Sequence, residues 1–153
     1  EVSNLIESKG YNNYLVEIGG ELRSKMMHKG NDWVVGIQHP KSNSVIKKIK
    51  LNNLSMATSG TYNNFFELDN IIYSHILNPK TGYPYKHKTI SSTVIADKCI
   101  DADAYATISM TMNPSDVLNL INNHNGVEVY IIELDENNGI IEYMSNGFEN
   151  IVY

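Results

Sequence analysis

Apolar and polar residues alternate over short segments along most of the chain, a pattern typical of half-buried β-strands. Glycine, proline, asparagine and aspartate separate these segments. We expect Gly19-Gly20 to mark a bulge or a close backbone approach, and Asp69-Asn70 to join two strands as a hairpin. The predicted strands are residues 14–18, 21–27, 33–38, 45–51, 54–59, 63–68, 71–76, 90–96, 127–134 and 140–144.

Helical segments are predicted at three places. Residues 2–9 form the tail of a helix that ends at Gly10. Residues 99–112 contain no glycine or proline and carry good helix formers on their inner positions, and residues 115–122 follow Pro114, which favours an early helical position. No repeat or linker interrupts the chain. The pattern therefore predicts a single α+β domain over residues 1–153, mainly an antiparallel sheet with a few packed helices.

Composition narrows the classes of protein. The 153 residues are 42% hydrophobic, which is enough for one domain with a buried core. The net charge of −5 argues against a nucleic-acid partner. Cys99 is the single cysteine, so an internal disulfide framework and a Cys₄ zinc site are excluded. No apolar run approaches transmembrane length, and the first residues do not resemble a signal peptide.

Residues 99–112 carry the first candidate chemistry. Asp103 and Thr107 are four residues apart, so a helix presents both on one face. A carboxylate and a hydroxyl are hard oxygen ligands that suit Mg²⁺, and a helix start favours phosphate nearby. The alternative is that Asp101 and Asp103 only cap the helix. The helix by itself leaves both interpretations open.

The second candidate is His75, at the end of the predicted strand 71–76. A loop with Asn78-Pro79 and Thr81-Gly82 follows it. Histidine is suited to acid–base work because its ordinary pKa lies near neutrality. The alternative is a histidine held by loop backbone. The remaining histidines lie among turn residues and are predicted on the surface: His28, His39, His87 and His124.

Together, the segments YSHILNPKTGYP (residues 73–84) and DADAYAT (residues 101–107) resemble the ApbE family of FAD:protein FMN transferases. Their order and spacing make the resemblance specific, and the similarity extends to residues 15–21, 33–40 and 57–62. Two positions depart from the family pattern: Asn78 stands where aspartate is usual, and Tyr105 where tryptophan is usual.

The resemblance implies a magnesium-dependent transfer of FMN from FAD to a threonine or serine of an acceptor flavoprotein, through a phosphoester. By this resemblance, His75 is the catalytic base. The implied flavin contacts are Ser59, Gly60 and Ile76, and for Ser59-Gly60 the alternative is an ordinary turn between strands. The implied metal ligands are Asp103, Thr107 and the backbone oxygen of Ala106.

Length leaves alternatives open. Family members are roughly twice this size, and the chain resembles their C-terminal half. A truncated or proteolysed form and a divided gene both fit, with the N-terminal half or a second copy as partner. The same residues would also fit an FAD pyrophosphatase that releases FMN to water, or a non-catalytic fragment. The chain does not indicate its location; family members are often exported and lipid-anchored at the bacterial cell envelope.

Overall fold

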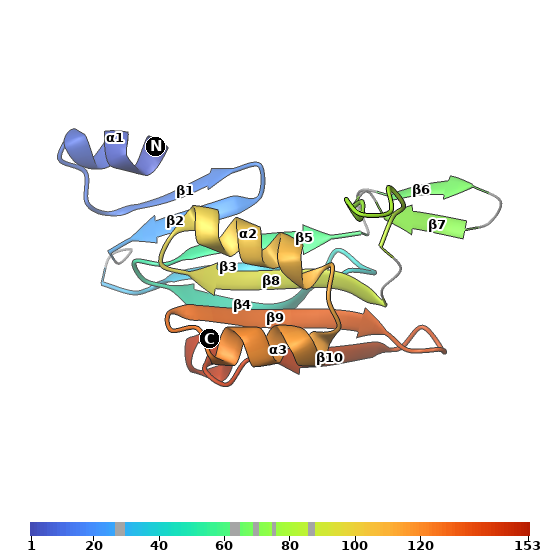
Figure 1. Cartoon of the computed structure of the whole chain (residues 1–153). Helices are drawn as coiled ribbons and strands as arrows, with labels where there is room; N and C mark the ends of the chain where they lie inside the picture. The colour runs from blue at the N-terminus through green and yellow to red at the C-terminus, as the bar shows by residue number, and fades with distance from the viewer. Residues whose placement is uncertain (27–29, 62–64, 69–70, 75, 86–87) are drawn as a thin grey trace.

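The computed structural model describes residues 1–26, 30–61, 65–68, 71–74, 76–85 and 88–153. In this part of the chain, six antiparallel strands form the central sheet in the order β1-β2-β5-β8-β9-β10 (Figure 1). The α+β class with a mainly antiparallel sheet is thus confirmed. The strands of this sheet are β1 Tyr14–Ile18, β2 Glu21–Lys25, β5 Ser55–Gly60, β8 Thr89–Ala96, β9 Val127–Leu134 and β10 Ile140–Met144.

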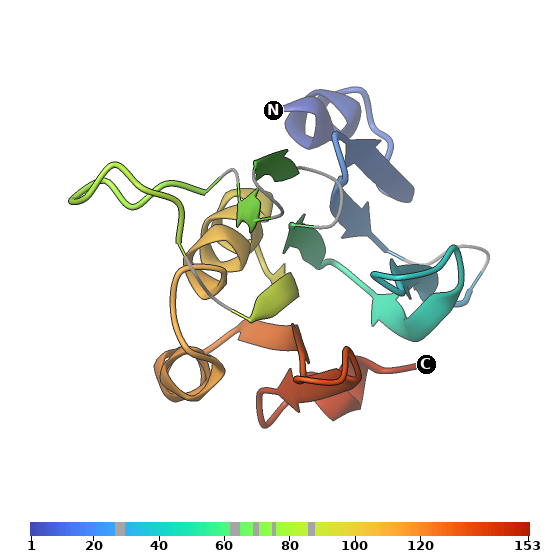
Figure 2. The same ribbon diagram turned by 90° about the vertical axis from the view of Figure 1, so that its right-hand side faces the viewer.

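Two helices cover one face of the sheet, α2 (Cys99–Ser109) and α3 (Pro114–Asn122), as Figure 2 shows from the end. Small side chains on α2, Ala102 and Ala106, let this helix approach the sheet closely. The buried cluster on this face is Ala57, Val94, Ala96, Ala102, Ala106, Val117, Ile121, Val127, Val129 and Ile131. Burial of this apolar surface is the main stabilising contribution of the helical layer.

A hairpin covers the other face. It pairs β3 (Trp33–Gln38) with β4 (Val45–Leu51), and a short 3₁₀ helix, η1 (Phe148–Ile151), packs beside it. The second buried cluster is Leu22, Ile37, Ile49, Leu51, Met56, Ile95, Tyr130, Ile132 and Phe148. Both faces of the middle of the central sheet are therefore covered within this chain, whereas the edge strand β1 ends at the exposed Ile18 (57%).

A separate two-stranded sheet pairs β6 (Phe65–Leu68) with β7 (Ile71–Ser74), and it projects beyond one end of the central sheet (Figure 1). The predicted strand 71–76 is therefore shorter than expected and pairs outside the central sheet. His75 lies outside the described residues, as does the Asp69-Asn70 turn. The following loop closes on itself, because Leu77 bridges to Pro84 and Gly82 adopts a φ of +73°.

Two local predictions were wrong. Gly19 and Gly20 do not interrupt a strand: both have positive φ (+69° and +105°) and form the two-residue turn that joins β1 to β2. α2 ends at Ser109 rather than at residue 112. There the N–H of Met110 bonds to the carbonyl of Thr107 (3.1 Å), which tightens the last turn and stops the helix.

Candidate active site

The exposed face of α2 presents both predicted metal ligands. Asp103 and Thr107 are exposed and lie one turn apart, about 5–6 Å between their Cβ atoms. The capping alternative is not supported, because the N-cap is Lys98 and no side chain caps the helix. Within the described residues, the Asp103 carboxylate has no hydrogen bond or ion pair. Among the described residues it is thus an unpaired carboxylate one helical turn from a hydroxyl, as the predicted metal site requires.

Strand β5 brings a second hydroxyl to this face. The Ser59 hydroxyl lies 3.3 Å from that of Thr107, although the two residues are 48 positions apart in the sequence. Ala57, two residues earlier on the same strand, packs in the cluster beneath α2, as the alternation of a strand requires. The structure thus joins two motifs that the sequence shows only separately. Gly60 follows as the last residue of β5 and pairs with Ser91, so it is a strand residue and not a turn residue.

One residue of this region has no signal of its own in the sequence. Ser92, on β8, lies directly opposite Ser59 in the antiparallel register, so the two side chains share the face under α2. Ser92 is 0% exposed, and its hydroxyl finds no hydrogen-bond partner in the described part of the chain. Only the pairing of β5 with β8 reveals a buried polar group next to the Ser59–Thr107 contact.

The remaining predicted residues lie in the core, in the loop or outside the described residues. Ala106 is 0% exposed and its side chain packs in the cluster beneath α2, and its backbone oxygen stays a predicted metal ligand. The carbonyl of Ile76 accepts the N–H of Tyr85 (3.1 Å) across the closed loop. His124 is exposed as predicted, and its Nε2 lies 3.0 Å from the Tyr105 hydroxyl.

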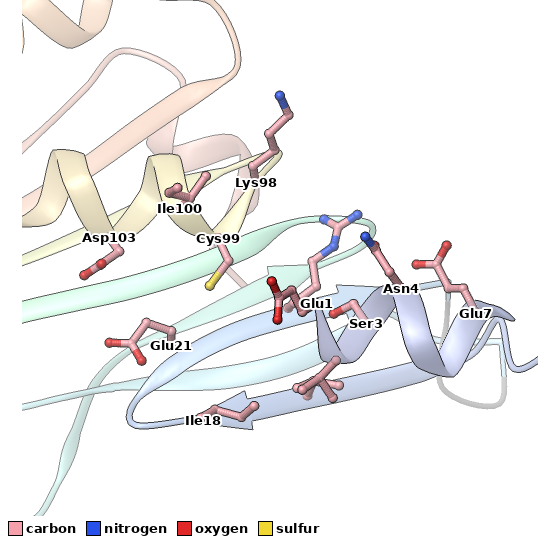
Figure 3. Close-up of a pocket in the computed structure, with 13 residues that line it drawn as sticks. Glu1, Ser3, Asn4, Glu7, Ile18, Glu21, Lys98, Cys99, Ile100 and Asp103 are labelled. Atoms are coloured by element: carbon pink, nitrogen blue, oxygen red, sulfur yellow. The ribbon is translucent and has the colours of Figure 1, made fainter. Parts of the chain in front are cut away.

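A cavity of about 830 Å³ opens beside Asp103, between α1 (Val2–Ser8), the β1–β2 hairpin and the start of α2. Figure 3 shows Asp103 and Cys99 on the side of α2 that faces Glu21 and α1. The residues that line the cavity are Glu1, Val2, Ser3, Asn4, Glu7, Val16, Ile18, Glu21, Arg23, Lys98, Cys99, Ile100 and Asp103. The candidate metal ligand therefore borders a space large enough for a cofactor-sized molecule.

Cys99 reports the electrostatics of this cavity. Burial raises the pKa of its thiol above the ordinary value, and the nearby carboxylates of Glu21 and Asp103 raise it further. We expect the alkylation of Cys99 by iodoacetamide to rise with pH around a midpoint above that of a free cysteine peptide. Asp103→Asn should lower the midpoint, because it removes one of the negative charges. The same midpoint in the variant and the parent chain would contradict this assignment of cause.

The residues present fit a magnesium ion better than a transition metal. Within the described ranges, no three His, Cys, Asp or Glu side chains gather closely enough to hold a metal by themselves. The candidate donors are the carboxylate of Asp103 and the hydroxyls of Thr107 and Ser59, which contact each other. All three are hard oxygen atoms. Mg²⁺ is commonly held by few protein ligands and keeps several waters or phosphate oxygens in its shell. The donor set therefore suits an ion shared with a phosphate-bearing substrate.

No helix among the described residues is long and apolar enough to cross a membrane.

Comparisons with known proteins define the class. The profile of the ApbE family matches residues 1–131, and the chain belongs to this family. It is 36% identical over 154 aligned residues to the FAD:protein FMN transferases of Klebsiella pneumoniae and Escherichia coli, covering 99% of this chain and 43% of each relative.

Solved structures agree in fold. The flavin transferase ApbE from Vibrio cholerae superposes with a TM-score of 0.84 at 32% identity, over 98% of this chain and 48% of that one. The apo form of the Pseudomonas stutzeri flavinyl transferase ApbE superposes with a TM-score of 0.81 at 30% identity, over 98% of this chain and 46% of that one. The chain thus spans less than half the length of the relatives it matches.

Proposed function

We propose that this chain contributes the metal-binding half of an FAD:protein FMN transferase. Family membership supports flavin transfer, since the matched relatives bear that name. The observation that carries the proposal is the contact between Ser59 and Thr107, which adds a hydroxyl to the Asp103–Thr107 pair. These oxygen donors suit Mg²⁺, and the adjoining cavity gives a substrate room beside them.

The proposed reaction replaces the phosphoanhydride bond between FMN and AMP in FAD by a phosphoester bond between FMN and the acceptor. The hydroxyl oxygen of an acceptor threonine or serine attacks the FMN phosphorus of FAD. That bond forms as the bond from phosphorus to the AMP oxygen breaks, and AMP leaves. His75 takes the proton of the attacking hydroxyl. Asp103, Thr107 and Ser59 would hold Mg²⁺, and the ion would supply positive charge to the pyrophosphate as it splits.

The test uses the chain alone and in a complete unit. The complete unit, the ApbE chimera, is the Vibrio cholerae flavin transferase with its segment that matches this chain replaced by this chain. Each protein is incubated with FAD, Mg²⁺ and a threonine-bearing acceptor flavoprotein, and the products are separated. Fluorescent flavin covalently bound to the acceptor in the chimera supports the proposal. Free FMN without labelled acceptor would instead indicate a pyrophosphatase, and no product from a folded chimera would indicate a non-catalytic fragment.

Ser59 provides a finer test of the site. In the ApbE chimera, Ser59→Ala is expected to raise the Mg²⁺ concentration for half-maximal transfer by about 10-fold, the scale of a lost supporting group at a metal site. Ser59→Thr keeps a hydroxyl and should restore most of the affinity. Thr58→Ala is the matched control, because the Thr58 hydroxyl bonds to Thr93 (2.8 Å) on the opposite face of β5. An unchanged magnesium dependence in Ser59→Ala would remove Ser59 from the site.

A further inference from the structure

Strand β8 carries a buried hydroxyl, that of Ser92, which has no hydrogen-bond partner in the described part of the chain. The residue is 0% exposed. Its neighbours on this face of the sheet are apolar, since Val94 follows two residues along β8 and Ile131 is opposite on β9. An unpaired hydroxyl in such surroundings destabilises the fold, so it indicates a role beyond packing.

Ser92 is within reach of Ser59. The two residues are directly opposite each other on the antiparallel strands β8 and β5, a position in which Cβ atoms are about 4.5–5.5 Å apart. At the next position of the same ladder, the opposed hydroxyls of Thr58 and Thr93 do form a hydrogen bond, at 2.8 Å. A change of side-chain rotamer is therefore enough to join Ser59 to Ser92, without any movement of the backbone.

The bond that Ser59 makes instead is long. Its hydroxyl lies 3.3 Å from that of Thr107, whereas about 2.7–2.8 Å is usual between two hydroxyl oxygens. A hydroxyl has one proton to donate and two lone pairs. When Ser59 and Thr107 each give a lone pair to one cation, their protons must point away from its positive charge. For Ser59 the side away from the exposed Thr107 is the buried surface of the sheet, where the oxygen of Ser92 is an unpaired acceptor.

We propose that Ser92 is a positioning residue of the metal site, an inference that rests on the proposed function. As Ser59 gives a lone pair to Mg²⁺, its hydroxyl turns from Thr107 and donates its hydrogen bond to the Ser92 oxygen. Ser92 thereby gains a partner, and the orientation of Ser59 as a ligand is fixed. Partners of this kind hold metal ligands in place, and their loss typically lowers the affinity for the metal about 10–100-fold.

The first test measures ion binding and not flavin transfer. Mn²⁺, which like Mg²⁺ is suited to oxygen ligands, is titrated into the ApbE chimera, and free Mn²⁺ is followed by electron paramagnetic resonance. Ser92→Ala should raise the dissociation constant about 10-fold, and Ser92→Thr, which keeps a hydroxyl, should restore most of the affinity. Parent-like binding by Ser92→Ala would overturn the role of Ser92 alone. A parent chimera that binds no Mn²⁺ would overturn the proposed metal site together with it.

A double variant tests the route of the effect, because Ser92 is proposed to act only through Ser59. The chimera with both Ser59→Ala and Ser92→Ala should bind Mn²⁺ no more weakly than the chimera with Ser59→Ala alone. Losses of affinity that add in the double variant would overturn the inference, since Ser92 would then act on the site without Ser59.

Ser91 is the matched control. It is also buried (1% exposed) and its hydroxyl also has no partner among the described residues, but it lies on the opposite face of β8. Without the ion, Ser91→Ala and Ser92→Ala should each raise the thermal unfolding midpoint of the isolated chain by about 2–4 °C, because each removes an unpaired buried group. Only Ser92→Ala should weaken the binding of Mn²⁺ to the chimera. A lower midpoint for Ser92→Ala, or an equal loss of affinity in both variants, would overturn the inference and indicate a structural role.

Discussion

Replacing Asp103 by alanine in the ApbE chimera is expected to lower flavin transfer by at least about 100-fold. Asp103 supplies the anionic ligand of the proposed site, and its carboxylate has no partner among the described residues to compensate for the loss. Thr107 and Ser59 are neutral hydroxyls that hold a divalent cation weakly without it. Loss of the ion would also leave the charge of the pyrophosphate unneutralised as it splits.

The control for this variant lies on the same helix. Asp101 is in the first turn of α2 and lines a smaller, separate pocket with Tyr105 and His124. Asp101→Ala should therefore keep nearly full transfer, with an unchanged magnesium dependence. The measurement is the rate of covalent flavin labelling at several Mg²⁺ concentrations. Parent-like transfer by a folded Asp103→Ala chimera would remove Asp103 from the mechanism.

His75→Ala in the same chimera is expected to lower transfer by about 10²–10⁴-fold, the usual contribution of a positioned general base. The acceptor hydroxyl must lose its proton as it attacks. The sequence places His75 at the entry to a closed loop, in which the N–H of Asn78 donates to the carbonyl of Tyr83 and the N–H of Gly82 donates to the carbonyl of Asn78. The magnesium concentration for half-maximal rate should not change, because His75 is not proposed as a ligand. A lower rate with an unchanged magnesium dependence would distinguish the proposed base, His75, from the proposed metal ligand, Asp103.

The role of His75 as a base also predicts the direction in which the transfer rate changes with pH. A base acts in its unprotonated form, so transfer by the parent chimera should fall towards acid pH as this base becomes protonated. The residual rate of His75→Ala should lose this limb. His124→Ala is the control, since His124 is exposed and contacts Tyr105. A full rate in His75→Ala, or the same acidic limb in its residual rate, would exclude His75 as the base.

The pattern of apolar residues predicted most of the elements because each strand and helix here has its own local signal. The errors arose where one local pattern allows two conformations. Gly19-Gly20 suits a bulge or a hairpin turn, and the choice depends on β1 folding back along β2. The end of α2 also escaped the pattern. Met110 and Met112 are good helix formers, yet the helix ends before them, where the N–H of Met110 forms a 3₁₀-type bond to the carbonyl of Thr107.

The candidate site could be predicted from the sequence only in part, because some of its residues meet only through the tertiary fold. Asp103 and Thr107 share a helix, so their spacing alone places them together. Ser59 required the resemblance to the family, and its contact with Thr107 depends on β5 passing beneath α2. Ser92 could not be chosen from the sequence, because a serine in a strand carries no sign of its burial or of its neighbour across the sheet.

Ser59 lies on a strand in the interior of the sheet. β5 is paired on both sides, with β2 and β8, and α2 packs on it through Ala102 and Ala106. The backbone that carries the proposed oxygen donors is therefore fixed by the core before an ion or a substrate binds. Binding at this site then costs little conformational entropy of the backbone, and only the exposed side chains of Asp103 and Thr107 have to be ordered.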